Sequence, residues 1–113
     1  MDDLLLSREE LDNIENNSIF TLWLFGNIDE FNLTDQEQKI IFARQMYYDL
    51  LLSDDEVYYT FNRIGCYDFD EFLHEPEYMI RASKLLGIRQ DIIITKVTLM
   101  KKRKQKEKKL GLR

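Results

Sequence analysis

Few side chains in this sequence could carry out chemistry. The chain has one histidine, His74, and one cysteine, Cys66, which is too few for a usual zinc site and leaves no histidine–nucleophile arrangement to assemble. Its four glycines are scattered and form no phosphate-binding loop. We therefore expect no enzyme activity, no metal and no cofactor.

Two acidic clusters are the remaining candidates for binding a metal ion. Residues 54–56 read DDE, and residues 68–71 read DFDE. A calcium loop needs alternating oxygen ligands, a central glycine and a terminal glutamate, and neither cluster has that pattern. Both clusters fall at predicted helix starts, where the positive end of the helix dipole stabilises carboxylates. We interpret them as helix-capping sequences.

Basic residues are concentrated at the C-terminus. Residues 81–113 hold 12 basic and 2 acidic residues, a net charge of +10, whereas residues 1–80 hold 4 basic and 19 acidic residues, a net charge of −15. The contrast divides a single domain into an acidic helical body, 1–77, and a basic part, 78–113. The run at 101–109, KKRKQKEKK, has no apolar side chain, so we expect it to pack on nothing and to project as a helix or fray.

Capping signals divide the chain into helices. Three stretches fit the capping box, in which a hydroxyl and a glutamate satisfy reciprocal backbone amides: 7–10, 34–37 and 53–56. With glycine stops after several helices, they predict an all-α bundle of about five or six short helices with a protruding basic C-terminal helix. The expected helices are 8–16, ended by Asn16-Asn17-Ser18, then 18–25, 35–52, 54–64, 69–73, 76–86 and one from about residue 89.

The last predicted helix has an unusual start. Ile92, Ile93 and Ile94 are β-branched and favour a strand, whereas Ile93, Val97 and Met100 have helical spacing. The sequence leaves residues 92–98 open between helix and strand. In the helix at 35–52, the spacing of Ile40, Ala43, Tyr47, Leu50 and Leu51 predicts a buried stripe.

The C-terminal part resembles the helix-turn-helix of the Fis-type DNA-binding family. The matching residues are Ala82-Ser83, residues 85–88, Ile93 and residues 108–112. A small residue before Gly87 lets two helices cross closely, and the glycine takes the turn. The resemblance implies that the second helix enters the major groove of DNA, where four residues would face bases and phosphates: Arg89, Gln90, Thr95 and Lys96.

Two functions fit these observations. The first is a small accessory or regulatory protein that binds nucleic acid through its basic C-terminal helix while the acidic body docks on a protein partner. The candidate nucleic-acid contacts are Arg89, Gln90, Thr95, Lys96, Lys101, Lys102, Arg103, Lys104, Lys106, Lys108 and Lys109. The second is an adaptor, inhibitor or assembly factor that binds only protein, with homo-oligomers formed if the basic arm pairs with the acidic body of a neighbouring copy.

Aromatic residues are the candidate protein-binding anchors, because aromatics dominate many interfaces. They are Phe20, Trp23, Phe25, Tyr47, Tyr48, Tyr58 and Tyr59. The first three fall in the apolar stretch 18–25 and are equally candidates for the core. The acidic start and short apolar runs predict no signal peptide and no membrane span, and one cysteine suits a reducing compartment. We expect an intracellular protein; its composition also suits a viral or phage protein inside a host cell.

Overall fold

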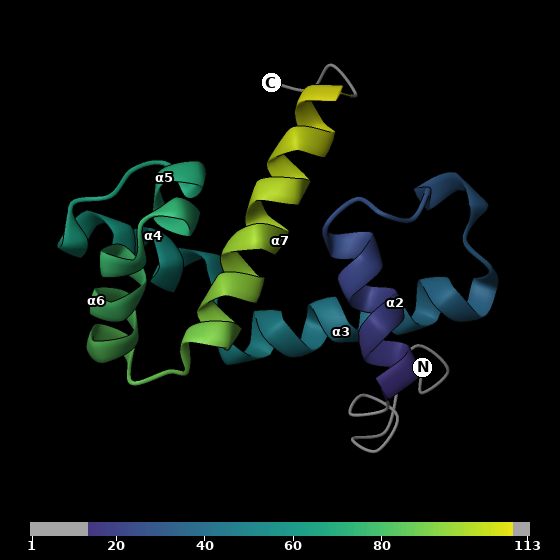
Figure 1. Ribbon diagram of the computed structural model, residues 1–113, viewed down its shortest axis with the longest axis horizontal. Coiled ribbons are helices and arrows are strands. Elements are labelled where there is room, and N and C mark those ends of the chain that lie inside the picture. The colour runs from purple at the N-terminus through teal and green to yellow at the C-terminus, as the bar shows by residue number, and fades with distance from the viewer. Residues whose placement is uncertain (1–13, 110–113) are drawn as a thin grey trace. The chain divides into compact units, whose positions relative to one another are not determined.

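All regular structure that can be described in this chain is helical (Figure 1). The computed structural model describes residues 14–109, and within them the side chains of 18–29 and 31–106. The prediction of an all-α fold with five or six helices is confirmed, and residues 92–98 are helical. The elements are α2 (Ile14–Leu24), the 3-10 helix η2 (Glu30–Asn32), α3 (Asp35–Leu51), α4 (Asp54–Ile64), α5 (Phe69–His74), α6 (Pro76–Leu86) and α7 (Gln90–Lys109).

Packing divides the chain into two compact units, Met1–Tyr47 and Tyr48–Arg113, and the boundary falls inside α3. We call them the first and second units. Residues 1–47 hold 3 basic and 10 acidic residues, a net charge of −7, and residues 48–113 hold 13 basic and 11 acidic residues, a net charge of +2. Many carboxylates therefore share a unit with the basic α7. The division after residue 77, drawn from charge, stays a prediction.

In the first unit, α2 runs without a break through Asn16-Asn17-Ser18, so the helix end predicted there is wrong. Asparagine and serine are weak helix formers, but the same helix buries Phe20 and Trp23, and this burial outweighs their low propensity. The two rings lie 6.0 Å apart between centroids. The capping box predicted at 7–10 lies outside the described residues.

The start of α3 is the capping box that the sequence predicts. The Glu37 amide donates to Thr34 Oγ1 at 3.1 Å, and the Thr34 amide donates to Glu37 Oε1 at 2.9 Å. Ile40 and Ile41 are buried farther along the helix, whereas Leu50 is exposed although its spacing predicted burial. Ala43 is also buried as predicted, so helical spacing found the first part of the buried face of α3 and failed toward the C-terminal end of the helix.

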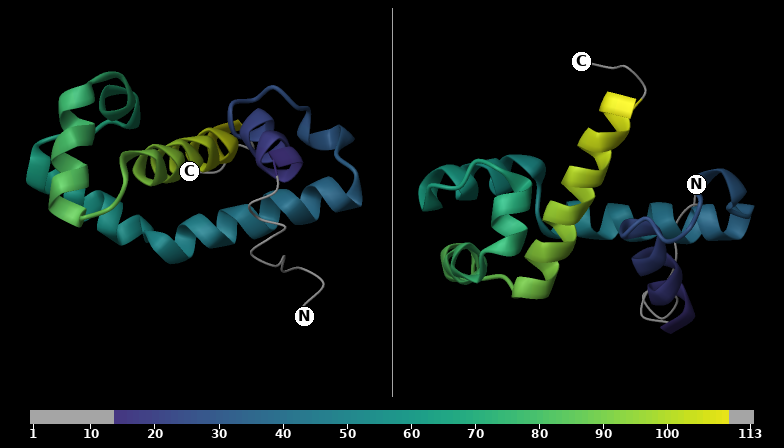
Figure 2. Two further views of the ribbon diagram at one scale, coloured as in Figure 1. Left: turned by 60° about the horizontal axis from the view of Figure 1, so that its bottom comes forward. Right: turned by 45° about the horizontal axis from the view of Figure 1, so that its top comes forward.

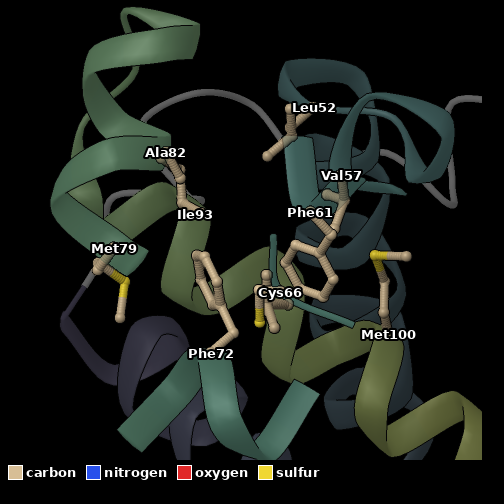
Figure 3. Packing of buried hydrophobic residues seen from close by; sticks show 10 residues of the cluster. Leu52, Val57, Phe61, Cys66, Phe72, Met79, Ala82, Ile93 and Met100 are labelled. Atoms are coloured by element: carbon tan, nitrogen blue, oxygen red, sulfur yellow. The ribbon is translucent and has the colours of Figure 1, made fainter. Parts of the chain in front are cut away.

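The second unit packs α6 against α4, α5 and α7, and α5 against α7. At its centre the rings of Phe61 and Phe72 lie 4.8 Å apart between centroids (Figure 3). Cys66 is fully buried in the same cluster, and its Sγ lies 3.5 Å from the Asp68 carbonyl oxygen. The buried members of this cluster are Leu52, Val57, Phe61, Cys66, Phe72, Met79, Ala82, Ile93, Val97 and Met100.

Predicted caps fix the ends of these helices. Ser53 forms a complete capping box with Glu56. Hydrogen bonding of the Glu56 carboxylate to the backbone and side chain of Ser53 holds the pKa of Glu56 below its ordinary value. Gly65 ends α4 at φ +77°, a conformation that other residues resist. Pro76 starts α6, where its missing amide costs nothing. These local signals position α4, α5 and α6 around the start of α7.

The long helix α7 is the centre of the second unit. Residues 96–100 are all buried, which means that this part of the helix is covered on every side. Its C-terminal turns then extend past α4, α5 and α6, as Figure 1 and the right panel of Figure 2 both show. The basic residues predicted to contact a partner therefore lie on two different parts of one helix.

Candidate nucleic-acid interface

The hairpin of α6 and α7 has the shape of a helix-turn-helix. Its turn is residues 87–89, and Gly87 has φ +66° and donates its amide to the Ser83 carbonyl at 2.9 Å. Ser83 Oγ donates to the Ile88 carbonyl at 2.7 Å, which closes the turn. Ala82 is fully buried, where its small side chain permits close packing of the two helices.

Few side chains on the predicted base-reading face of this hairpin are available to contact DNA. Arg89 is exposed but donates to both oxygens of Asp91, at 3.0 and 2.5 Å, and these bonds hold the pKa of Asp91 below its ordinary value. Thr95 is half-buried, and its hydroxyl donates to the Asp91 carbonyl at 2.8 Å. Only Gln90 is an exposed neutral polar side chain among the four predicted contacts.

Lys96 does not have the position that the resemblance implies. Its side chain is 1% exposed, and its Nζ lies 2.5 Å from Asp49 Oδ1 and 2.6 Å from Asp54 Oδ1. A phosphate could be contacted only after both ion pairs break. The prediction that Lys96 faces DNA is therefore wrong, because the helix turns this residue into the interior of the second unit.

Arg103 lies two helical turns after Lys96 and contacts the same carboxylates. Its Nη2 donates to both oxygens of Asp49, at 3.2 and 2.9 Å, and its Nη1 lies 3.8 Å from Asp54. Burial raises the pKa of Asp49, but the hydrogen bonds from Lys96 and Arg103 outweigh burial and hold it below the ordinary value. These four residues form a charged cluster that joins the α3–α4 corner to α7.

Lys101 pairs with Asp70 at the start of α5, and this contact lowers the pKa of Asp70. The expectation that residues 101–109 pack on nothing is wrong at Lys101 and Arg103, because carboxylates of α3 and of the first turns of α4 and α5 face them. The charge contrast seen along the sequence is thus partly neutralised inside the second unit.

The remaining predicted lysine contacts lie in the C-terminal part of α7. Lys104 and Lys106 are exposed and Lys102 is half-buried, while the side chains of Lys108 and Lys109 lie outside those described. Lys104 Nζ lies 5.7 Å from the centroid of the Phe69 ring. With Arg89 and Gln90, the exposed Lys104 and Lys106 make up the accessible part of the predicted nucleic-acid surface.

A groove beside these lysines was not expected from the sequence. It lies between α4, α5 and α7, has a volume of about 480 Å³, and is formed entirely within the second unit. Because its members come from residues 58–70 and from the distant residues 101–105, no local spacing pattern could identify it. We call it the α4–α5–α7 groove; it is lined by Tyr58, Phe61, Asn62, Tyr67, Asp68, Phe69, Asp70, Lys101, Lys104 and Gln105.

The predicted protein-binding aromatics differ in burial and are divided between the two units. Phe20 and Trp23 are buried, so the core interpretation holds for both and the prediction that they contact a partner is wrong. Phe25, Tyr47, Tyr58 and Tyr59 are exposed, and Tyr48 is half-buried. They are divided between the two units, and only Tyr58 lines the α4–α5–α7 groove. Sequence reasoning missed the most exposed aromatic, Phe31, in the connector between α2 and α3.

Comparison with known proteins adds no relative: no protein-family model, curated protein or solved structure matches this chain. Across residues 14–109, no group of three or more histidine, cysteine, aspartate or glutamate side chains is placed to hold a metal ion. Nor does any helix in that range have the length and apolar character needed to cross a membrane.

Proposed function

We propose that this chain is a small accessory protein that binds nucleic acid through the C-terminal half of α7, while its acidic first unit docks on a protein partner. One observation carries the proposal: α7 continues for nine residues after Met100, the last residue of its buried stripe, as a helix rich in lysine. Three of its lysines have described side chains: Lys104 and Lys106 are exposed, and Lys102 is half-buried.

Ion pairing inside the second unit supports a contact with the phosphate backbone rather than readout by the N-terminal half of α7. Lys96, Lys101 and Arg103 are engaged with carboxylates of the protein itself, and Arg89 is engaged with Asp91. Lysines near the end of a projecting helix can approach phosphates without breaking those pairs. Such binding releases counterions and weakens as salt rises, by about 0.9 in the log–log slope per phosphate contact on a duplex.

The test is fluorescence anisotropy with a labelled mixed-sequence oligonucleotide over a salt series. The test variant is Lys102→Gln/Lys104→Gln/Lys106→Gln, and the control with the same charge change is Arg63→Gln/Arg81→Gln/Lys84→Gln, on α4 and α6. We expect the test variant to lose at least about tenfold in affinity and about 2–3 in salt slope. The control should stay within about twofold. Equal losses in both variants, or no binding by the unaltered chain at low salt, would refute the proposal.

A second candidate, a protein-binding adaptor that does not contact nucleic acid, is favoured by the surface of the first unit. Phe31 is 93% exposed and Phe25 is 59% exposed, in a unit of net charge −7. Exposed aromatics surrounded by acidic residues suit a basic protein surface. A partner isolated with the unaltered chain should be lost with Phe25→Ser/Phe31→Ser and kept with the triple lysine variant. Loss with the lysine variant alone would argue against this candidate.

A further inference from the structure

The α4–α5–α7 groove presents aromatic rings to solvent. Tyr67, in the connector between α4 and α5, is 78% exposed, and Tyr58 of α4 is also exposed. Phe69 is held between Tyr58 and the core, because its ring lies 6.3 Å from that of Tyr58 and 5.8 Å, edge on, from that of Phe61. With the exposed Tyr67 in the same lining, these rings offer a surface on which a flat aromatic ligand can stack.

The charges lining the groove cancel, which limits the ligand group that it can hold. Lys101 is paired with Asp70, and Asp68 caps α5 by accepting the Asp70 amide at 2.8 Å. With Lys104 included, the lining has two positive and two negative side chains. A phosphate gains little net attraction in such a place, and a neutral group suffers no repulsion.

Two amides complete the lining. Asn62 and Gln105 each carry a donor and an acceptor, which is the combination that the edge of a nucleobase requires. The volume of about 480 Å³ falls in the range of sites that hold small planar ligands. A ligand that is flat, neutral and polar at its edge is better matched by a nucleobase than by a lipid or an aliphatic side chain.

Exposed lysines continue from the groove along α7. Lys104 lies at the groove and Lys106 lies two residues farther along α7, and both are exposed. Phosphates on either side of a bound base could follow these lysines. Proteins that bind single strands use this combination, in which bases stack on aromatic side chains and the backbone follows a cationic track.

Building on the nucleic-acid function proposed above, we infer that the α4–α5–α7 groove holds an unpaired base, so that the chain binds single-stranded nucleic acid in preference to duplex. Bases inside a duplex are stacked on their neighbours and paired at their edges. Their faces are therefore not accessible to Tyr58 and Tyr67 unless the duplex opens, which costs a few kcal/mol per base.

The experiment compares a labelled single strand with its own duplex in anisotropy titrations at one salt concentration. Tyr67→Ala and Tyr58→Ala remove the stacking rings, whereas Tyr67→Phe keeps the ring and removes only the hydroxyl. Tyr59→Ala is the matched control, because Tyr59 is an exposed tyrosine of α4 that does not line the groove. Circular dichroism checks that every variant keeps its helices.

We expect the unaltered chain to bind the single strand at least about tenfold more tightly than the duplex, and Tyr67→Ala to lose about tenfold on the single strand only. Tyr67→Phe and Tyr59→Ala should retain full affinity. Equal affinity for both strand forms, or equal losses from Tyr67→Ala and Tyr59→Ala, would overturn the groove assignment. If the triple lysine variant abolishes binding while the tyrosine variants change nothing, the nucleic-acid function stands and the groove assignment fails. If neither strand form binds, both fail.

Discussion

Replacing Lys96 by methionine should destabilise the protein less than removing the carboxylates that face it. The reason is an asymmetry in burial across the charged cluster. The Lys96 side chain is 1% exposed, whereas those of Asp49 and Asp54 are 41% and 53% exposed. Removing Lys96 therefore leaves two partly hydrated carboxylates, whereas removing the carboxylates leaves a buried ammonium group.

Lys96→Met removes the buried ammonium and fills its place with a flexible apolar chain of similar length. The two carboxylates left behind are partly hydrated and still face Arg103, so we expect a loss of at most about 1 kcal/mol. Asp49→Asn/Asp54→Asn instead leaves the ammonium buried beside a second cation, Arg103. Removing the partners of a buried charge costs about 3–5 kcal/mol, a large part of a typical stability of about 5–15 kcal/mol.

Urea unfolding followed by far-ultraviolet circular dichroism measures both variants. Fluorescence of Trp23, the only tryptophan, reports on the first unit separately, and that signal should change less. Lys101→Met is the matched control, since Lys101 is more exposed and pairs with one carboxylate, and it should cost under about 1 kcal/mol. A loss from Lys96→Met equal to or larger than that from the double aspartate variant would refute the reasoning.

Three further predictions follow from the fold. Asp49 and Asp70 have folded-state pKa values below the ordinary 3.8, so their contribution to stability is present above that pH and is lost as pH falls below it. The urea midpoint should therefore fall between pH 7 and pH 3, and it should depend less on pH in Asp49→Asn/Asp70→Asn. Trp23→Ala should cost about 3–5 kcal/mol by thermal unfolding, since Trp23 is buried, and an unchanged melting temperature would contradict its core position. Ser53→Ala should cost about 1 kcal/mol through the lost capping box, while Ser53→Thr, which keeps the hydroxyl, should lose less than half of that.

Most helix boundaries from α3 onward could be predicted because the signals that set them are local. A capping box spans four residues, and a glycine with positive φ needs no distant partner. Thr34, Ser53, Pro76, Gly65 and Gly87 all have the roles that the sequence predicts. The end predicted for α2 failed for a related reason: local propensity at residues 16–18 was outweighed by burial of aromatic side chains farther along the same helix.

Ion pairs between distant segments could not be predicted in the same way. Lys96 and Asp49 are 47 residues apart, and nothing near either residue indicates that they meet. One signal was present and was not used: Lys96 lies three residues after Ile93 and four before Met100, on the buried stripe itself. A lysine at such a position requires either a counter-charge or a route to solvent. The resemblance to a DNA-binding hairpin instead placed the Lys96 side chain on the surface that faces DNA.

The burial of Cys66 provides a way to measure local opening of the second unit. It is the only thiol of the chain, it is fully buried between α4 and α5, and burial raises its pKa. A thiol reagent can therefore reach it only when the packing around Phe61 and Phe72 opens. The rate at which the thiol is modified in native buffer therefore reports how often the core opens. A ligand of any chemical class that binds the folded second unit should lower this rate.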